Sequence, residues 1–180
     1  MLLSMNIYLF PTELEAEPFR AVCPDAHVVI SGVGMAATAA TLSQLYARHS
    51  IDTESVVVLA GIAGAYKGDL KQGDVVEVVE ECCAELPERF IKRYVVEPYT
   101  NLRAVRSNSV HGAGSEPFGA DIENMEGAAL FAMADALGFR AVEIRAISNY
   151  VGEEFASWRL DDALKALAEL LVSHIVVANL

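Results

Sequence analysis

Apolar residues along this chain follow two alternating patterns, short continuous runs and longer stretches with helical spacing. The short runs predict strands at residues 6–10, 27–31, 55–60, 75–80, 94–97, 104–110 and 139–148. Helical spacing predicts helices over residues 12–22, 35–49, 124–137 and 161–177. Because strands and helices alternate, we expect one α/β domain, residues 1–180, with a central mixed, mostly parallel sheet flanked by helices.

Two short turns that contain glycines follow predicted strands, Ser31–Gly34 after the second and Gly61–Gly64 after the third. Glycines at the end of a strand let the backbone approach a ligand, although tight turns and close strand–helix packing also require them. The first turn lacks the third glycine of a dinucleotide fingerprint, and Asp52 does not stand in the strand context that this fingerprint needs. We therefore reject NAD binding.

Three polar residues stand near the ends of otherwise apolar elements. Glu126 lies in the first turn of the helix predicted over 124–137, where the helix dipole stabilises a carboxylate and where sugar hydroxyls could bind. Glu15 has the capping-box spacing to Thr12, which explains it without catalysis. Asn149 ends the last predicted strand and decides nothing alone. If these ends face each other, they form a small pocket with a fixed acid and a neutral amide.

Composition limits the classes of function. The chain is 53% apolar and 21% charged, which indicates a globular protein with a large core and hints at buried subunit interfaces. Its net charge of −12 argues against binding to nucleic acid or to an anionic membrane. The longest apolar run, residues 56–66, is too short to span a bilayer, and Cys23, Cys82 and Cys83 are typical of reduced thiols. We expect a cytoplasmic protein, and the four histidines lack the spacing of a metal site.

Taken in order, several segments resemble the nucleoside phosphorylase and nucleosidase superfamily. The matching segments are residues 31–37, 61–64, 73–74, 124–129 and 145–149. Within this superfamily the chain is most similar to the futalosine hydrolases, the nucleosidases of the alternative menaquinone pathway. That closer similarity rests on Glu-Asn-Met-Glu-Gly at 123–127, Ile-Ser-Asn-Tyr-Val at 147–151 and Thr-x-Leu-Glu-Ala at 12–16.

The resemblance implies a site at the carboxyl ends of the strands of a phosphorylase-like fold, with no metal or organic cofactor. It implies that Met125 packs beneath a ribose and that Glu126 binds the ribose hydroxyls. It also implies that an N-terminal glutamate, Glu13 or Glu15, polarises the attacking water, and we prefer Glu15. The residues expected to bind the base are Ile62, Ala63, Gly64, Ser148 and Asn149, with the segment 107–112 lining the base.

Two residue types then favour one reaction within the superfamily. Phosphorylases carry an arginine and a serine where this chain has Leu59 and Ile62, and an apolar pair cannot bind a phosphate dianion, so water is the expected nucleophile. Adenosine-type nucleosidases carry an aspartate where Asn149 stands. An amide donates to a 6-oxo group and accepts from a protonated ring nitrogen, so Asn149 favours hypoxanthine over adenine as the leaving group.

The expected activity is hydrolysis of futalosine to release hypoxanthine. Two alternatives remain: a methylthioadenosine/S-adenosylhomocysteine-type nucleosidase, and a purine-nucleoside-binding module with reduced catalysis. Only 50 residues separate Asp74 from Asn124, so the middle of the fold is expected to be shortened, with Phe118 or Trp158 replacing a missing base-stacking aromatic residue. The expected partners are a small purine nucleoside and further copies of the chain, in a homodimer or larger homo-oligomer.

Overall fold

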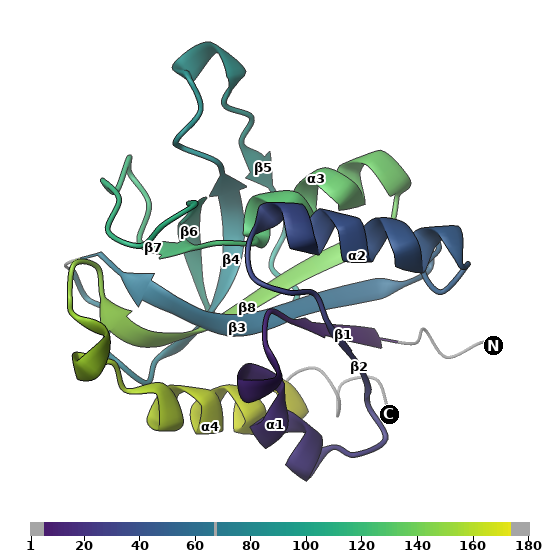
Figure 1. Ribbon diagram of the computed structural model, residues 1–180, viewed down its shortest axis with the longest axis horizontal. Coiled ribbons are helices and arrows are strands. Elements are labelled where there is room, and N and C mark those ends of the chain that lie inside the picture. The colour runs from purple at the N-terminus through teal and green to yellow at the C-terminus, as the bar shows by residue number, and fades with distance from the viewer. Residues whose placement is uncertain (1–5, 67, 174–180) are drawn as a thin grey trace.

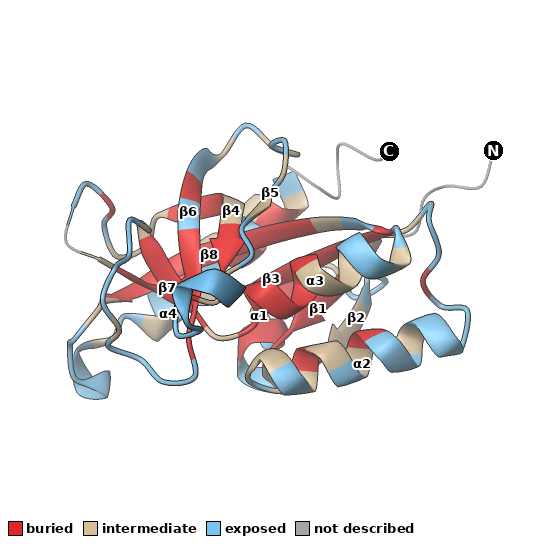
Figure 2. Ribbon diagram, turned by 90° about the horizontal axis from the view of Figure 1, so that it is seen from above, coloured by how far each residue is buried: buried red, intermediate tan, exposed pale blue. Residues whose placement is uncertain are grey.

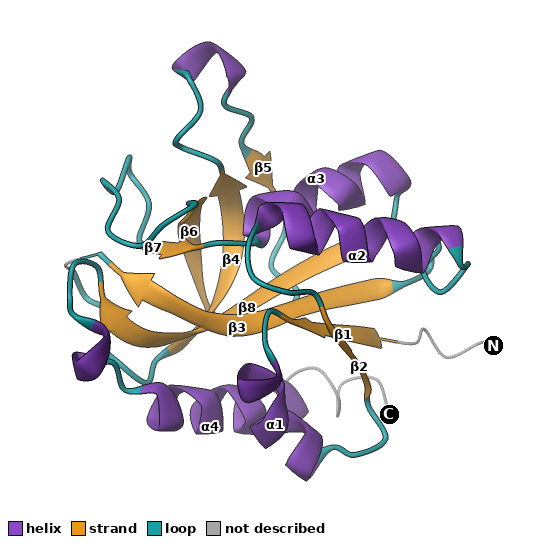
Figure 3. Cartoon of the chain, in the orientation of Figure 1, coloured by secondary structure: helices purple, strands orange, loops and turns teal. Residues whose placement is uncertain are grey.

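A sheet of eight strands flanked by helices forms the framework of the protein (Figures 1 and 3). The computed structural model describes residues 6–66 and 68–173. The strands are β1 (Asn6–Phe10), β2 (His27–Ile30), β3 (Val56–Ala65), β4 (Val75–Cys82), β5 (Tyr94–Val95), β6 (Arg103–Ser109), β7 (Ile122–Asn124) and β8 (Arg140–Tyr150). The helices are α1 (Glu13–Val22), α2 (Met35–Ala47), α3 (Gly127–Leu137) and α4 (Leu160–Leu171), with short 3₁₀ turns η1 (Glu88–Phe90) and η2 (Phe155–Ser157).

The strand order is β2-β1-β3-β7-β6-β4-β5, and β8 pairs with both β3 and β4. These pairings close five strands, β3, β7, β6, β4 and β8, into a ring at one end of the sheet. Five of the eight pairings are parallel, so the predicted mixed, mostly parallel α/β sheet is confirmed. The ring was not predicted, because periodicity says nothing about which strands pair.

Helices cover both faces of the sheet, with α1 and α4 on one side and α2 and α3 on the other (Figure 1). Along β1, Tyr8 and Phe10 pack in the cluster that contains α1 and α4 residues, whereas Ile7 and Leu9 pack with α2 and α3 residues. Both faces of the central strands are therefore buried, as Figure 2 shows by their colour. This double burial explains why these strands read as continuous apolar runs.

Most predicted boundaries within the described residues agree with the structure to within two residues, but two differ by more, and both lie at the site. The segment Gly61–Gly64 was expected to be a turn, but β3 continues through it to Ala65 because β8 and β7 pair with it, with a register shift at Ala63/Gly64. The helix predicted from Asn124 begins only at Gly127. Asn124 instead ends β7, which pairs in parallel with β6. In both cases pairing between distant strands overrides the local pattern.

The last helix, α4, ends at Leu171. The end predicted for it, near Val177, lies outside the described residues. Within residues 6–66 and 68–173, none of the helices has the length and apolar character needed to cross a membrane.

Candidate active site

A cavity of about 280 Å³ opens where β1, β3, β6, β7 and β8 end. This volume is near the lower end of the range for small-molecule sites, about 300 Å³. The carboxyl ends of parallel strands are the usual place for ligand sites in such sheets. The lining residues are Pro11, Thr12, Leu14, Glu15, Val33, Ile62, Ala63, Gly64, Val110, Ala113, Glu123, Asn124, Met125, Glu126, Ser148, Asn149, Phe155, Trp158, Leu160 and Leu164.

Glu15 reaches the cavity from the first turn of α1, and only 7% of its surface is exposed. Thr12 caps the helix by accepting the Glu15 backbone N–H at 3.2 Å, as the predicted capping box requires. The Glu15 side chain does more than cap, because Oε2 accepts from the Thr12 hydroxyl at 2.7 Å and Oε1 accepts from the Ile62 N–H at 3.1 Å. Burial raises the pKa of Glu15 although both hydrogen bonds oppose the shift. A fixed carboxylate with a raised pKa is suited to general-base catalysis.

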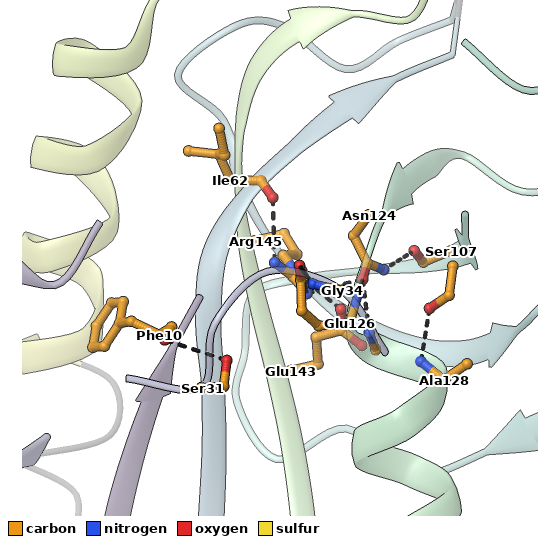
Figure 4. A network of polar contacts seen from close by, with 12 residues as sticks. Phe10, Ser31, Gly34, Ile62, Ser107, Asn124, Glu126, Ala128, Glu143 and Arg145 are labelled. Atoms are coloured by element: carbon orange, nitrogen blue, oxygen red, sulfur yellow. Dashed lines mark hydrogen bonds and ion pairs between the residues drawn. The ribbon is translucent and has the colours of Figure 1, made fainter. Parts of the chain in front are cut away.

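Met125 and Glu126 reach the cavity from a turn that the Asn124 side chain holds. Asn124 Oδ1 accepts from the backbone N–H of Glu126 and of Gly127, each at 2.7 Å. The Glu126 carboxylate does not cap α3 by a side-chain hydrogen bond. Oε1 accepts from the Gly34 N–H at 2.9 Å, which brings the predicted Ser31–Gly34 turn to the site (Figure 4).

Arg145 is fully buried behind the cavity wall and connects the polar groups there (Figure 4). Its guanidinium donates to Glu143 Oε1 at 2.8 Å and to Glu126 Oε2 at 3.2 Å. It also donates to Asn124 Oδ1 at 2.9 Å. Burial alone would lower the pKa of Arg145, but the carboxylates of Glu143 and Glu126 raise it. Arg145 therefore stays charged, and its charge is already neutralised by these partners.

Gly61 makes this arrangement possible. A Cβ at Gly61 would lie 2.8 Å from both Glu15 Oε1 and Arg145 Nη1. Real Cβ atoms do not approach polar atoms so closely, so only glycine fits here without displacing one of these side chains. The glycine in mid-strand marks the close approach of two buried, charged side chains.

Asn149 lies beside Gly64 at the end of β8. Gly64 is in register with Asn149 on one side and with Glu123 of β7 on the other. Asn149 Oδ1 accepts from the Ser148 hydroxyl at 2.8 Å, and Nδ2 donates to the Tyr150 carbonyl at 3.1 Å. Each end of the amide keeps one further hydrogen-bonding position for a ligand.

The cavity is acidic. Glu15, Glu123 and Glu126 line it, and none of its lining residues within the described part of the chain is Lys, Arg or His. Such a wall favours neutral or cationic groups and opposes an anion such as phosphate. Among the described residues, no group of three or more His, Cys, Asp or Glu side chains is placed to hold a metal ion.

Comparison with known proteins gives the relationship. The model of the Phosphorylase superfamily matches residues 115–176. Futalosine hydrolase from Thermus thermophilus is 30% identical over 210 aligned positions, which cover 91% of this chain and 92% of that protein. The chain belongs to the futalosine hydrolase family. Those 210 positions exceed the 180 residues present, so at least part of the relative has no counterpart here, while the shortening between Asp74 and Asn124 stays a prediction.

Solved structures share the predicted fold. A futalosine hydrolase mutant from Helicobacter pylori has a TM-score of 0.74 at 15% identity, covering 97% of this chain and 99% of that one. The 5′-methylthioadenosine nucleosidase from Arabidopsis thaliana has a TM-score of 0.81 at 17% identity, covering 98% and 96%. The phosphorylase-like fold inferred from the sequence motifs is therefore confirmed.

Most of the residues predicted for the site lie together in the cavity. They are Glu15, Ile62, Ala63, Gly64, Met125, Glu126, Ser148 and Asn149. Glu13, the other candidate base, does not line the cavity. Its carboxylate is exposed and pairs with Arg20 on the surface of α1. The geometry therefore separates two glutamates that sequence spacing alone left open.

The structure also separates the candidates for base stacking. Trp158 lines the cavity, and its ring centroid lies 5.1 Å from that of Phe155. Phe118 is exposed and lies outside the lining residues. From the segment 107–112, only Val110 lines the cavity.

Sequence reasoning missed three acidic residues at or behind the site. Glu123 lines the cavity, and it accepts from the backbone N–H of Gly114 at 2.7 Å and of Ser115 at 3.0 Å, which ties the loop between β6 and β7 to the wall. Glu81 and Glu143 lie fully buried in β4 and β8. Glu143 interrupts an apolar run, and this interruption was a signal that could have identified it.

Proposed function

We propose that the protein hydrolyses the N-ribosyl bond of futalosine and releases hypoxanthine. The observation that carries this proposal is Asn149 in a cavity that three carboxylates and no described basic residue line. Membership of the futalosine hydrolase family supports the same substrate. The reaction would belong to the menaquinone pathway in which such hydrolases act.

Glu15 is the proposed general base. It takes a proton from water as the water oxygen bonds to the anomeric carbon, while the bond from that carbon to the purine nitrogen breaks. Positive charge develops on the sugar in such a dissociative transition state. Glu126 would bind the ribose hydroxyls and, with Glu15, stabilise that charge, while Met125 packs against the sugar ring.

Asn149 is proposed to receive the departing base, with Ile62, Ala63, Gly64 and Ser148 around it. Its Nδ2 would donate to the 6-oxo group, and its Oδ1 would accept from the ring N–H once the departing purine has taken a proton from solvent water. The 2.8 Å hydrogen bond from Ser148 favours the orientation of the amide in which Oδ1 is the accepting atom. An adenine would set its amino group against the Nδ2 donor, so hypoxanthine is favoured.

Water is the proposed nucleophile, and the apolar side chains of Leu59 and Ile62 support this choice. Leu59 is fully buried in the cluster with α2 and α3 residues, and Ile62 lines the cavity with an aliphatic side chain. Neither supplies a positive charge or a hydroxyl for phosphate. An unpaired phosphate dianion beside Glu15 and Glu126 would be strongly destabilised.

One assay tests the proposal. Purified protein is incubated with futalosine, inosine or methylthioadenosine, with and without phosphate, and the free base is quantified. We expect hypoxanthine from futalosine at a rate that phosphate does not raise. Adenine from methylthioadenosine would identify the alternative nucleosidase, and binding of hypoxanthine or inosine without turnover would identify a binding module.

The proposed active form is a cytoplasmic homodimer or larger homo-oligomer with one nucleosidase domain, residues 1–180, in each subunit. Leu14, Val33 and Phe155 line the cavity although more than half of each residue is exposed, so a second copy could cover this apolar rim. Light scattering on the purified protein tests this assembly, and a monomeric mass would contradict it.

A further inference from the structure

Two carboxylates meet behind the site beneath the start of α3. Glu81 and Glu143 are both 0% exposed. A Cβ at Gly127 would lie 2.4 Å from Glu81 Oε2 and 2.5 Å from Glu143 Oε2. The two oxygens are therefore within about 5 Å of each other, the range in which like charges strongly oppose ionisation.

Three of the four oxygens of these carboxylates accept hydrogen bonds within the described part of the chain, and one has no donor. Glu81 Oε1 accepts from the Cys82 N–H at 2.8 Å, and Oε2 accepts from Asn124 Nδ2 at 2.7 Å. Glu143 Oε1 accepts from Arg145 Nε at 2.8 Å. Glu143 Oε2 is buried and has no hydrogen-bond partner among the described residues. A buried carboxylate oxygen without a donor is costly, so a donor is needed at this position.

The charged groups around the pair indicate that a proton on one of the two carboxyl groups supplies this hydrogen-bond donor. Glu81 faces Glu143 and Arg145 of β8, with the neutral side chains of Asn124 and Ser107 beside it, and Glu143 also faces Glu126. Glu15 adds a further carboxylate near Arg145, which is the one cation among these groups. Burial and the neighbouring Glu143 raise the pKa of Glu81 to about 8, and burial also raises the pKa of Glu143. Two buried carboxyl groups this close disfavour the state in which both are ionised.

We propose that Glu81 and Glu143 share one proton and together act as positioning residues for Glu126. A proton on Glu81 Oε2 gives Glu143 Oε2 the donor that it lacks. The pair then carries one negative charge, which faces Arg145 from behind while Glu126 faces it from the cavity side. This proposal rests on the proposed function, because it takes Glu126 as the group that binds ribose.

The shared proton makes the site sensitive to alkaline pH. When the pair loses its proton, a second negative charge appears behind Arg145 and competes with Glu126 for the guanidinium. Asn124 transmits the same change, because its Nδ2 contacts Glu81 while its Oδ1 holds the Glu126 N–H. The KM for the nucleoside is therefore expected to rise on the alkaline side.

Glutamine variants test this inference. In Glu81→Gln the amide cannot ionise, and its Nε2 in the place of Oε2 donates to Glu143 but no longer accepts from Asn124 Nδ2. The variant should therefore bind nucleoside more weakly than native protein at neutral pH, and the alkaline rise in KM should disappear. Glu80→Gln is the matched control, since Glu80 is the neighbouring residue of β4 and pairs with Arg93. The double variant Glu81→Gln/Glu143→Gln removes the single negative charge behind Arg145 and should raise KM at least about tenfold at neutral pH.

The inference is overturned if Glu81→Gln keeps the alkaline profile of native protein and of Glu80→Gln. It is also overturned if the double variant binds nucleoside as well as the single one.

Thermal melting without substrate separates this inference from the proposed function. Between the ordinary pKa of Glu and about 8, Glu81 binds more protons in the folded protein than in the unfolded chain, so the contribution of this group to stability falls as pH rises. That fall should be smaller in Glu81→Gln than in Glu80→Gln. If native protein hydrolyses no nucleoside but this difference is present, the shared proton is supported and the positioning role fails. Equal melting profiles overturn the shared proton.

Discussion

Replacement of Glu15 by glutamine is the most direct test of the site. Glutamine has the same shape, and its amide can keep both contacts, accepting the Ile62 N–H and donating to the Thr12 hydroxyl. The backbone cap from Thr12 to residue 15 does not involve the side chain that changes. The variant therefore removes a charge and a proton acceptor while the first turn of α1 is expected to stay in place.

The expected loss of kcat follows from the role of a general base. Such a group contributes about 10²–10⁴-fold, which corresponds to about 3–5 kcal/mol in the activation free energy. Stability should move in the opposite direction. Because burial raises the pKa of Glu15, the folded state disfavours its ionised form, and stability from this group is lost as pH rises through the folded pKa. At neutral pH the neutral variant should melt at the same or a higher temperature.

Glu13→Gln is the matched control. Glu13 is two residues away on the same helix, but its carboxylate is exposed and pairs with Arg20 at the surface. We expect native kcat in this variant, since exposed ion pairs contribute little to stability and this one does not reach the cavity. The measurement is hypoxanthine release with futalosine, together with melting curves. The reasoning is refuted if Glu13→Gln loses as much activity as Glu15→Gln, or if Glu15→Gln stays fully active.

Two more substitutions and one pH profile test other parts of the site. Asn149→Asp should shift the ratio of kcat/KM for futalosine and methylthioadenosine by about 100-fold toward the adenine nucleoside, and an unchanged ratio would remove Asn149 from base recognition. Gly61→Ala should lower kcat at least about tenfold, because the new Cβ displaces Glu15 or Arg145, whereas Gly112→Ala, where a Cβ meets no atom within 4 Å, should be neutral. In native protein kcat/KM should fall as the pH is lowered, with a midpoint above the ordinary pKa of Glu, because burial raises the pKa of Glu15. A midpoint at the ordinary pKa of Glu would contradict that shift.

Local pattern was enough to predict most elements of this fold. The doubly buried strands read as continuous apolar runs because α1 and α4 cover one face and α2 and α3 the other. The helix cap by Thr12 could also be predicted from the sequence, because the N–H group that it accepts belongs to a residue only three positions away. Features set by neighbours in the sequence are the ones that a single sequence encodes directly.

Features set by distant pairing could not be predicted in this way. β3 was cut short at its glycines because a lone sequence does not show that β7 and β8 pair with them. The choice between Glu13 and Glu15 depended on which side of α1 faces Ile62, a contact 47 residues away. Glu81 and Glu143 belong to strands that meet only when the ring closes, so their proximity has no trace in spacing.

The acidity of the cavity connects the choice of nucleophile with the stabilisation of the transition state. Glu15, Glu123 and Glu126 place negative charge around the cavity, and Arg145 behind them is held by Glu126 and Glu143. A phosphate dianion would have to enter against this charge, whereas water carries none. In the proposed reaction the same carboxylates would stabilise positive charge as it develops on the ribose. Burying so many carboxylates opposes folding, and replacing such a network by apolar residues often stabilises a protein. Its presence at the cavity is therefore better explained by the reaction than by stability.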